Sequence, residues 1–302
     1  LNFLKAGDLL VFNNTRVFRA RLSGVLPTGG KVEIFLLHPA MSAGRDWIAL
    51  GRPGRKLKAG VIVKFKGDPT ARVVRPLPDG TIKINFGLSA AEVIRLANRI
   101  GSIPVPPYIS RAIKSESQYQ TVYARKTGSV AAPTAGFHFT RRLLAQIKQR
   151  GIQTKFVTLH VGLGTFRPIK TSRLEEHEMH AEWAEAPADT RRALSAAKGR
   201  VIAVGTTTVR ALEGLMNQSS SKGQNKGWVN LFIKPGYNFK RINGLVTNFH
   251  LPKSTLLVLV SAFARTTREP MDAGRKKVLK AYQQAIKLNY HFYSFGDAML
   301  II

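Results

Sequence analysis

Two stretches of the sequence join an apolar run to a turn of small and polar residues. Residues 156–168 read FVTLHVGLGTFRP, and residues 201–213 read VIAVGTTTVRALE. Each apolar run is typical of a buried strand, and the second stretch continues with the pattern of a helix. Strands that alternate with helices form a sheet covered by helices on both faces. The two stretches therefore predict an α/β fold whose main domain is layered α/β/α.

The same alternation extends outward from these stretches along most of the chain. We expect helices over 115–125, 141–150, 189–198, 207–216, 254–264 and 272–288. We expect strands over 9–12, 152–160, 201–204, 229–233, 245–249 and 290–295. Thr140 and Gly151 support the second helix, because threonine caps helix starts and glycine ends them.

Residues 19–86 follow a different pattern, in which Gly, Pro and Asp separate short alternating segments. The segments are 19–24, 31–37, 47–50, 61–66, 71–75 and 81–86. Such spacing predicts a small β-barrel inserted in the main domain. Ser89 and Glu92 form the pattern of a capping box for a following helix, and 103–109 reads as an extended linker. We place the main domain at 1–17 and 103–302, and the inserted barrel at 18–102.

The chain is strongly basic, with 47 Lys and Arg against 17 Asp and Glu and a net charge of +30. Such a field attracts polyanions, so we expect a nucleic-acid partner. Arg52, Arg55, Lys56 and Lys58 crowd one turn of the predicted barrel, where they either contact RNA phosphates or form a solvated face. There are no cysteines, which excludes disulfides and thiolate metal sites. The longest apolar run, 255–264, is too short to span a bilayer.

Histidines mark two of the candidate sites. His138 follows an Ala-Gly pair and His160 precedes the Gly162–Gly164 turn, so backbone can approach a ligand beside a titratable side chain. Residues 177–180 read HEMH, in which the histidines are three apart rather than four as in HExxH. A metal site, a structural role and proton transfer are all open for these residues. Arg167 stands where GxGxxG needs its third glycine, which argues against a dinucleotide loop.

Polar residues also follow several predicted strands. At each position a local role in a turn or cap competes with contact to a substrate. Arg210 lies one turn into a helix whose start favours an anionic group such as a carboxylate. The candidates for substrate positioning are Asn13, Arg16, Thr165, Arg210, Asn248 and His250.

Nine segments, taken together, resemble one known family. They are GDLLVFNNTRV at 7–17, IPVPPYI at 103–109, YQTVYA at 119–124, VAAPTAGFHFT at 130–140, TLHVGLGTFRP at 158–168, EEHEMHAEW at 175–183, VIAVGTTTVRALE at 201–213, LVTNFHLPKSTLLVLVSAFA at 245–264 and YSFGDAML at 293–300. The family is that of the S-adenosylmethionine:tRNA ribosyltransferase-isomerases of queuosine synthesis. Its members carry a further N-terminal segment before the part that matches Gly7, so we expect one to be missing here.

The resemblance implies an enzyme that attaches the ribosyl part of S-adenosylmethionine to a 7-aminomethyl-7-deazaguanine at the tRNA wobble position. S-adenosylmethionine is then a consumed substrate, no metal or other cofactor is needed, and we expect a cytoplasmic monomer without a membrane contact. This chemistry needs acids and bases, for which we choose His138, His160, Glu178 and His180. We expect the target base of the anticodon stem-loop to stack on an aromatic side chain, with Tyr108, Tyr119 and Phe137 as candidates.

Two other functions compete with this one. A non-catalytic RNA-binding protein would need the positive charge but not the clusters of histidine and glycine. An S-adenosylmethionine-dependent RNA methyltransferase is disfavoured because the glycine-rich nucleotide loop is missing.

Overall fold

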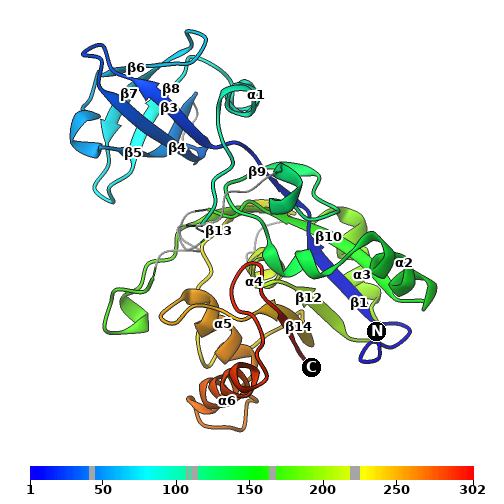
Figure 1. Cartoon of the computed structure of the whole chain (residues 1–302). Coiled ribbons are helices and arrows are strands. Elements are labelled where there is room, and N and C mark those ends of the chain that lie inside the picture. Colours follow the sequence, from blue (N-terminus) through cyan, green and yellow to red (C-terminus); the bar gives the residue numbers. More distant parts are fainter. Residues whose placement is uncertain (41–44, 107–108, 110–114, 163–167, 218–224) are drawn as a thin grey trace. The chain divides into compact units, whose positions relative to one another are not determined.

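The computed structural model describes the chain except for residues 41–44, 107–108, 110–114, 163–167 and 218–224. The described chain divides into two compact units (Figure 1). The first comprises Leu1–Thr15, Tyr119–Lys126 and Ala132–Ile302, and the second comprises Arg16–Gln118 and Thr127–Ala131. We retain residues 18–102 as our proposal for the inserted domain.

A seven-stranded sheet forms the centre of the first unit, in the order β13-β11-β10-β1-β12-β14-β15. The strands are β1 (Leu9–Asn13), β10 (Gln153–Leu159), β11 (Glu182–Glu185), β12 (Val201–Val204), β13 (Lys226–Val229), β14 (Gly244–Asn248) and β15 (Ala298–Ile301). The four central strands β10, β1, β12 and β14 run parallel. β11 pairs antiparallel with β10, β13 pairs antiparallel with β11, and β15 pairs antiparallel with β14. Parallel strands are buried on both faces, and all five residues of β1 are buried.

Helices cover both faces of this sheet. Successive residues of a strand point to opposite faces, so the contacts of neighbouring β1 residues show which helix lies on each face. On one face Leu10 and Phe12 share a hydrophobic cluster with Ile147 of α2. On the other face the Asn13 amide donates to Thr207 of α4. The helices of this unit are α2 (Arg141–Gln149), α3 (Ala188–Ala196), α4 (Thr206–Asn217), α5 (Thr255–Phe263) and α6 (Ala273–Lys287). Short 3₁₀ segments lie at η3 (Thr134–His138) and η5 (Leu174–Glu176). The predicted α/β/α layering is confirmed.

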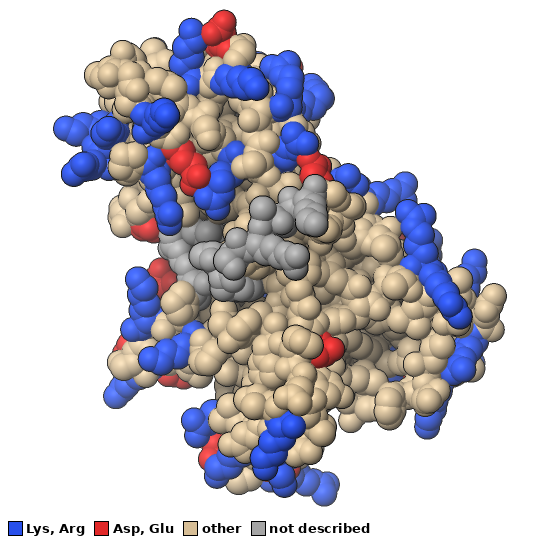
Figure 2. Space-filling view, viewed as in Figure 1, with Lys and Arg blue, Asp and Glu red and all other residues tan. Residues whose placement is uncertain are grey.

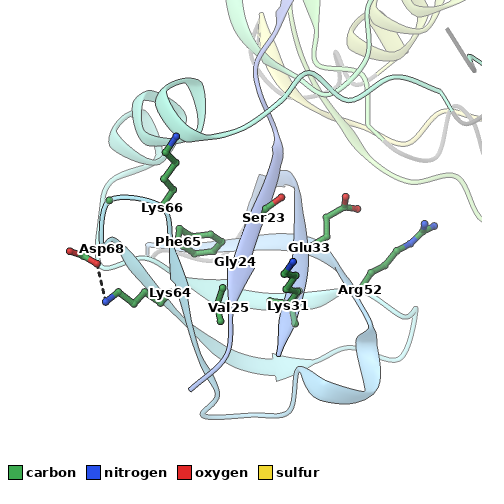
Figure 3. Close-up of a pocket in the computed structure, with 12 residues that line it drawn as sticks. Ser23, Gly24, Val25, Lys31, Glu33, Arg52, Lys64, Phe65, Lys66 and Asp68 are labelled. Carbon is green, nitrogen blue, oxygen red and sulfur yellow. Dashed lines mark ion pairs between the residues drawn. The ribbon is translucent and has the colours of Figure 1, made fainter. Parts of the chain in front are cut away.

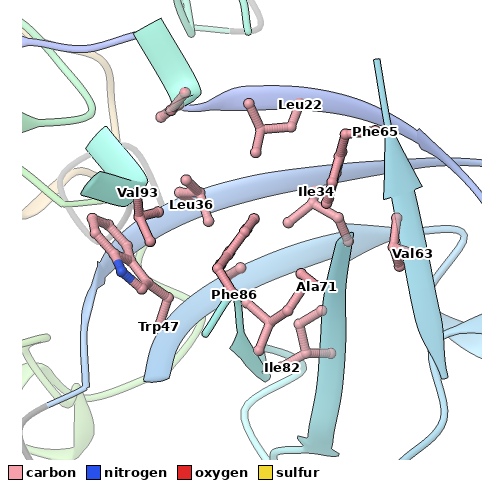
Figure 4. Close-up of a cluster of buried hydrophobic side chains, with 14 of the residues drawn as sticks. Leu22, Ile34, Leu36, Trp47, Val63, Phe65, Ala71, Ile82, Phe86 and Val93 are labelled. Carbon is pink, nitrogen blue, oxygen red and sulfur yellow. The ribbon is translucent and has the colours of Figure 1, made fainter. Parts of the chain in front are cut away.

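The second unit contains a closed barrel in the order β3-β4-β5-β8-β7-β6. Its strands are β3 (Arg21–Val25), β4 (Lys31–Pro39), β5 (Asp46–Arg52), β6 (Ile62–Phe65), β7 (Thr70–Pro76) and β8 (Ile82–Asn85). Inward-facing Ile34, Trp47 and Phe65 fill the barrel, and Val93 of α1 (Ala90–Ile100) joins the same cluster (Figure 4). The capping box of Ser89 and Glu92 starts α1 as predicted. The short 3₁₀ segments η1 (Gly54–Lys56) and η2 (Glu116–Tyr119) lie on the loops, and β2 (Thr15–Val17) pairs with β9 (Lys126–Ser129).

Three predicted elements differ from the structure, and tertiary packing explains the first. The helix expected over 115–125 forms only the 3₁₀ turn η2, because Tyr119 is fully buried and Tyr123 packs edge-on against Phe12 at 5.0 Å. The strand expected over 290–295 is a turn, with Tyr293 at φ 71°, and the strand follows at β15. The strand expected over 229–233 lies earlier, at β13, where it pairs with the unpredicted strand β11.

Within the described ranges, no helix is long and apolar enough to cross a membrane.

Adjacent valines on β7 test the barrel core. Val73 is fully buried and Val74 is 38% exposed. We expect Val73→Ala to lower the free energy of unfolding by about 1–3 kcal/mol, because it removes buried methyl groups and leaves a cavity. Val74→Ala should stay within about 0.5 kcal/mol of the wild type. Urea denaturation followed by tryptophan fluorescence measures both, and equal decreases would contradict the described burial.

Candidate active site

The carboxyl ends of four parallel strands meet at one edge of the sheet. His160 follows β10, Thr15 follows β1 by one residue, Gly205 follows β12, and His250 lies two residues beyond β14. In open α/β sheets, ligands bind outside the carboxyl ends of the strands. This edge, which we call the carboxyl edge, is therefore the candidate active site.

Asn13 lies beneath the carboxyl edge and is fully buried. Its Nδ2 donates to the Leu159 carbonyl at 3.0 Å and to Thr207 Oγ1 at 3.2 Å. Its Oδ1 accepts from the backbone N–H of Thr15 at 3.1 Å and of Leu159 at 3.0 Å. These bonds join β1, β10 and α4, so Asn13 supports the edge from below.

His160 forms the first polar group of the carboxyl edge. Its Nδ1 lies 2.8 Å from Thr15 Oγ1, and its ring stacks on Trp183 at 5.2 Å. Burial lowers the pKa of His160 to about 4, and the positive charge of Lys126 contributes in the same direction. The imidazole is therefore neutral at pH 7 and is able to accept a proton.

His138, on η3, and Asn248, at the end of β14, form the second polar group of the carboxyl edge. The His138 Nε2 lies 3.2 Å from Asn248 Nδ2. The same Nδ2 donates to the Tyr293 carbonyl at 3.1 Å, while the Asn248 Oδ1 accepts from Thr134 Oγ1 at 3.4 Å. The amide orientation is thereby set, so His138 Nε2 accepts and Nδ1 carries the proton. Burial lowers the pKa of His138, and the carboxylate of Asp297 partly opposes this shift.

His250 belongs to the same end of the edge. Its Nε2 lies 2.7 Å from Thr247 Oγ1, and its backbone N–H donates to the Tyr282 hydroxyl at 2.7 Å. Burial lowers the pKa of His250 to about 4. The side chain is thus a neutral, internally bonded histidine at the end of β14.

The two polar groups lie at different places along the edge. His160 follows β10 and Asn248 ends β14, with β1 and β12 between these strands. Three strand spacings separate them by about 14 Å. His138 and His160 therefore cannot exchange a proton directly, and a ligand that uses both must extend along the edge.

The segment 177–180 alternates between half-buried and exposed residues. His177 packs against the Phe232 ring at 5.4 Å, and Met179 lines a small pocket together with Arg210 of α4 and Leu256 and Leu259 of α5. Burial and nearby His180 lower the pKa of His177. Glu178 and His180 are exposed, so the segment is anchored through His177 and Met179. Among the described residues, no group of three or more His, Cys, Asp or Glu is placed to hold a metal.

Arg210 has a different surrounding from the one expected for a carboxylate receptor. It forms a buried ion pair with Glu182 and donates from Nε to the Leu231 carbonyl at 3.2 Å. Glu182 also accepts from the Gly162 backbone N–H at 2.7 Å. This pair therefore fixes the backbone at Gly162, a role that the sequence analysis missed for Glu182. Thr165, like Tyr108, lies outside the described residues, and Arg16 is an exposed residue of the second unit.

The barrel carries its own positive surface (Figure 2). The four predicted cations Arg52, Arg55, Lys56 and Lys58 are all exposed around η1. Arg52 also lines a groove with a volume of about 820 Å³ (Figure 3). The other cations of this groove are Lys31, Lys64 and Lys66, of which Lys64 pairs with Asp68 at 2.9 Å. Several closely spaced cations suit a phosphate backbone.

Comparison with known proteins gives a consistent result over the full length. A family model described as "Queuosine biosynthesis protein" matches residues 1–301. The chain belongs to this family. A relative from Halothermothrix orenii, named S-adenosylmethionine:tRNA ribosyltransferase-isomerase, is 47% identical over 100% of this chain and 86% of its own length. One of the same name from Carboxydothermus hydrogenoformans is 48% identical over 99% and 86%.

A solved structure is also similar to this queuosine biosynthesis family member. It is the crystal structure of S-adenosylmethionine tRNA ribosyltransferase from Thermotoga maritima. It shares 33% sequence identity, with a TM-score of 0.49, over 100% of this chain and 84% of that chain.

The pKa of His160 gives a test of the site's electrostatics. Because the folded pKa is about 4 and the ordinary value is 6.5, the unfolded chain binds more protons between these values. His160 therefore destabilises the fold as the pH falls from about 6.5 to 4. NMR titration of the histidine rings should show no change for His160 between pH 7.5 and pH 5.5, with the signal assigned from its absence in His160→Gln. A midpoint near pH 6.5 would contradict the described burial.

Proposed function

We propose that this queuosine biosynthesis protein is an S-adenosylmethionine:tRNA ribosyltransferase-isomerase. The enzyme joins the ribosyl group of S-adenosylmethionine to the aminomethyl nitrogen of a 7-deazaguanine at the tRNA wobble position. The ribose rearranges to an epoxycyclopentanediol, and adenine and methionine leave, giving epoxyqueuosine-tRNA. The observation that carries the proposal is the match to curated proteins of this name at 45–48% identity over nearly the whole chain.

The geometry of the carboxyl edge supports this chemistry. A base must take a proton from the carbon next to the sulfonium, and an acid must give one to the departing adenine. His138 and His160 are both held neutral by burial, so at pH 7 each ring carries one N–H and one unprotonated nitrogen for acid–base chemistry. His160 follows β10 and His138 bonds Asn248 of β14, three strand spacings or about 14 Å along the sheet, which fits separate tasks on an extended substrate or pair of substrates. S-adenosylmethionine is consumed as a ribosyl donor, and we assign the enzyme no metal or other cofactor.

We assign further residues to the proposed site from their positions along the chain and the fold. Glu178 and His180 remain candidates for proton transfer from the exposed segment beside η5. For substrate positioning we propose residues at the ends of strands and starts of helices: Asn13, Arg16, Thr165, Arg210, Asn248 and His250. Asn13 and Arg210 act in this scheme by shaping the edge, because their side chains are buried in internal bonds.

We assign the recognition of the anticodon stem-loop to the barrel's cation cluster. Arg52, Arg55, Lys56 and Lys58 are exposed and contact phosphates, whereas the base to be modified enters the carboxyl edge. We also propose that the enzyme is a monomer and acts in the cytoplasm, where its tRNA substrate is found.

The direct test incubates the protein with S-adenosylmethionine and tRNA that bears the aminomethyl-deazaguanine. Chromatography of the small products and mass spectrometry of the nucleosides should show adenine, methionine and a cyclopentane-modified nucleoside. S-adenosylhomocysteine with a singly methylated nucleoside would contradict the proposal and indicate a methyltransferase. Salt-sensitive tRNA binding without turnover would favour the RNA-binding alternative.

Charge reversal on the barrel tests the RNA interface. Arg55→Glu with Lys56→Glu should weaken tRNA binding, and should reduce the slope of log affinity against log salt by about 1 for each phosphate that the variant no longer binds. The control, Arg275→Glu with Lys280→Glu, makes the same change in net charge at exposed positions of α6. Filter binding at several salt concentrations measures the tRNA affinity and the salt slope of the barrel variant and of the α6 control. Equal effects in both variants would show that only net charge matters.

A further inference from the structure

Aromatic side chains gather beside His138 at the β14 end of the carboxyl edge. Phe137 and Phe295 stack with ring centroids 5.5 Å apart and planes at 22°. Tyr119 packs against both, at 6.1 Å and 6.2 Å. Tyr119 is fully buried, yet Phe295 is 53% exposed. Phe137 stacks on the Phe295 ring, and about half of the Phe295 residue remains exposed.

The turn that carries Phe295 is tightly closed. The Asp297 N–H donates to the His291 carbonyl at 2.7 Å, and the His291 N–H donates to Asp297 Oδ2 at 2.7 Å. Gly296 leaves no room for a Cβ, because the backbone of His291 occupies that space. Phe295 is therefore presented by a rigid turn rather than by a loose loop.

The same turn contains a strained residue. Tyr293 has φ 71°, a conformation that is uncommon for a bulky side chain. Such strain persists only where surrounding contacts hold it, and it concentrates at functional sites. Here the Tyr293 N–H donates to the Phe249 carbonyl at 3.0 Å, and its carbonyl accepts from Asn248. The aromatic ring of Phe295 is thus fixed relative to the Asn248–His138 pair.

An exposed ring beside buried polar groups has a clear use. Within this cluster Tyr119 is fully buried, whereas Phe295 is 53% exposed. Flat aromatic rings of nucleobases stack on exposed aromatic side chains, while nearby polar groups bond their edges. His138, with a proton on Nδ1, and Asn248 supply such polar groups.

We infer that Phe295, backed by Phe137, is a stacking platform for the purine-type ring of a substrate, with His138 at the edge of that ring. This inference rests on the proposed function, which brings two such rings to the enzyme: the adenine of S-adenosylmethionine and the 7-deazaguanine of the tRNA. Both offer a flat bicyclic face to Phe295. The platform lies at the β14 end of the edge, and three strand spacings, about 14 Å, separate β14 from β10, which His160 follows.

The test compares substitutions that keep or remove the ring. Phe295→Leu removes the aromatic face and keeps apolar bulk, whereas Phe295→Tyr keeps the face. Phe3→Leu is the matched control, because Phe3 is a 67% exposed aromatic before the opposite end of β1. Calorimetry with S-adenosylmethionine alone, and fluorescence titration with anticodon stem-loop RNA bearing the aminomethyl-deazaguanine, give the two affinities. Thermal unfolding checks that each variant is folded.

We expect Phe295→Leu to weaken one of the two affinities about 5- to 150-fold, with Phe295→Tyr and Phe3→Leu close to wild type. Weaker binding of S-adenosylmethionine assigns the platform to adenine, and weaker binding of the RNA assigns it to the deazaguanine. Unchanged affinity for both ligands in Phe295→Leu would overturn the inference, as would equal decreases in the Leu and Tyr variants. Turnover by the wild type is measured separately, so failure of the proposed function would show there and not in this comparison.

Discussion

The amide of Asn13 holds the carboxyl edge together. Its four hydrogen bonds reach the backbone of β10, the Thr15 N–H at the start of β2, and the first turn of α4. A buried amide that satisfies all of its donors and acceptors in this way stabilises one arrangement of the strands and penalises others. Asn14 adds to this join, since its Oδ1 accepts from Thr158 Oγ1 at 2.7 Å. The positions of Thr15 and His160, and hence the first polar group of the site, follow from this bonding.

The site combines neutral histidines with buried carboxylates that are bonded to other groups. Glu182 and Arg210 form a buried ion pair in which Glu182 also accepts from the Gly162 N–H. Glu213 accepts from the Tyr237 hydroxyl and from the backbone N–H groups of Lys240 and Arg241. A buried ion pair contributes little net stability, but removal of one partner leaves an uncompensated charge. We therefore infer that these carboxylates hold loop backbone in place, while the imidazoles remain available for proton transfer.

Local sequence predicts much of the fold but less of the site. The strand β12 was predicted to the residue, because four apolar residues lie between Gly199-Arg200 and Gly205, and the barrel followed from its alternation and its turns. The helix predicted over 115–125 does not form, because burial of Tyr119 and Tyr123 outweighs the local helix propensity. The pairing of His138 with Asn248 joins residues 110 positions apart, and the pairing of Arg210 with Glu182 joins residues 28 apart. Spacing within a motif carries no information about such contacts.

The central claim is that substrate binds along the carboxyl edge of β10, β1, β12 and β14. The most direct measurement is a crystal structure of the protein with S-adenosylmethionine bound. We predict electron density for the ligand outside the carboxyl ends of these strands, in contact with the His138–Asn248 group, the His160–Thr15 group, or both. Density confined to the barrel groove, or at the amino ends of the strands, would contradict the account.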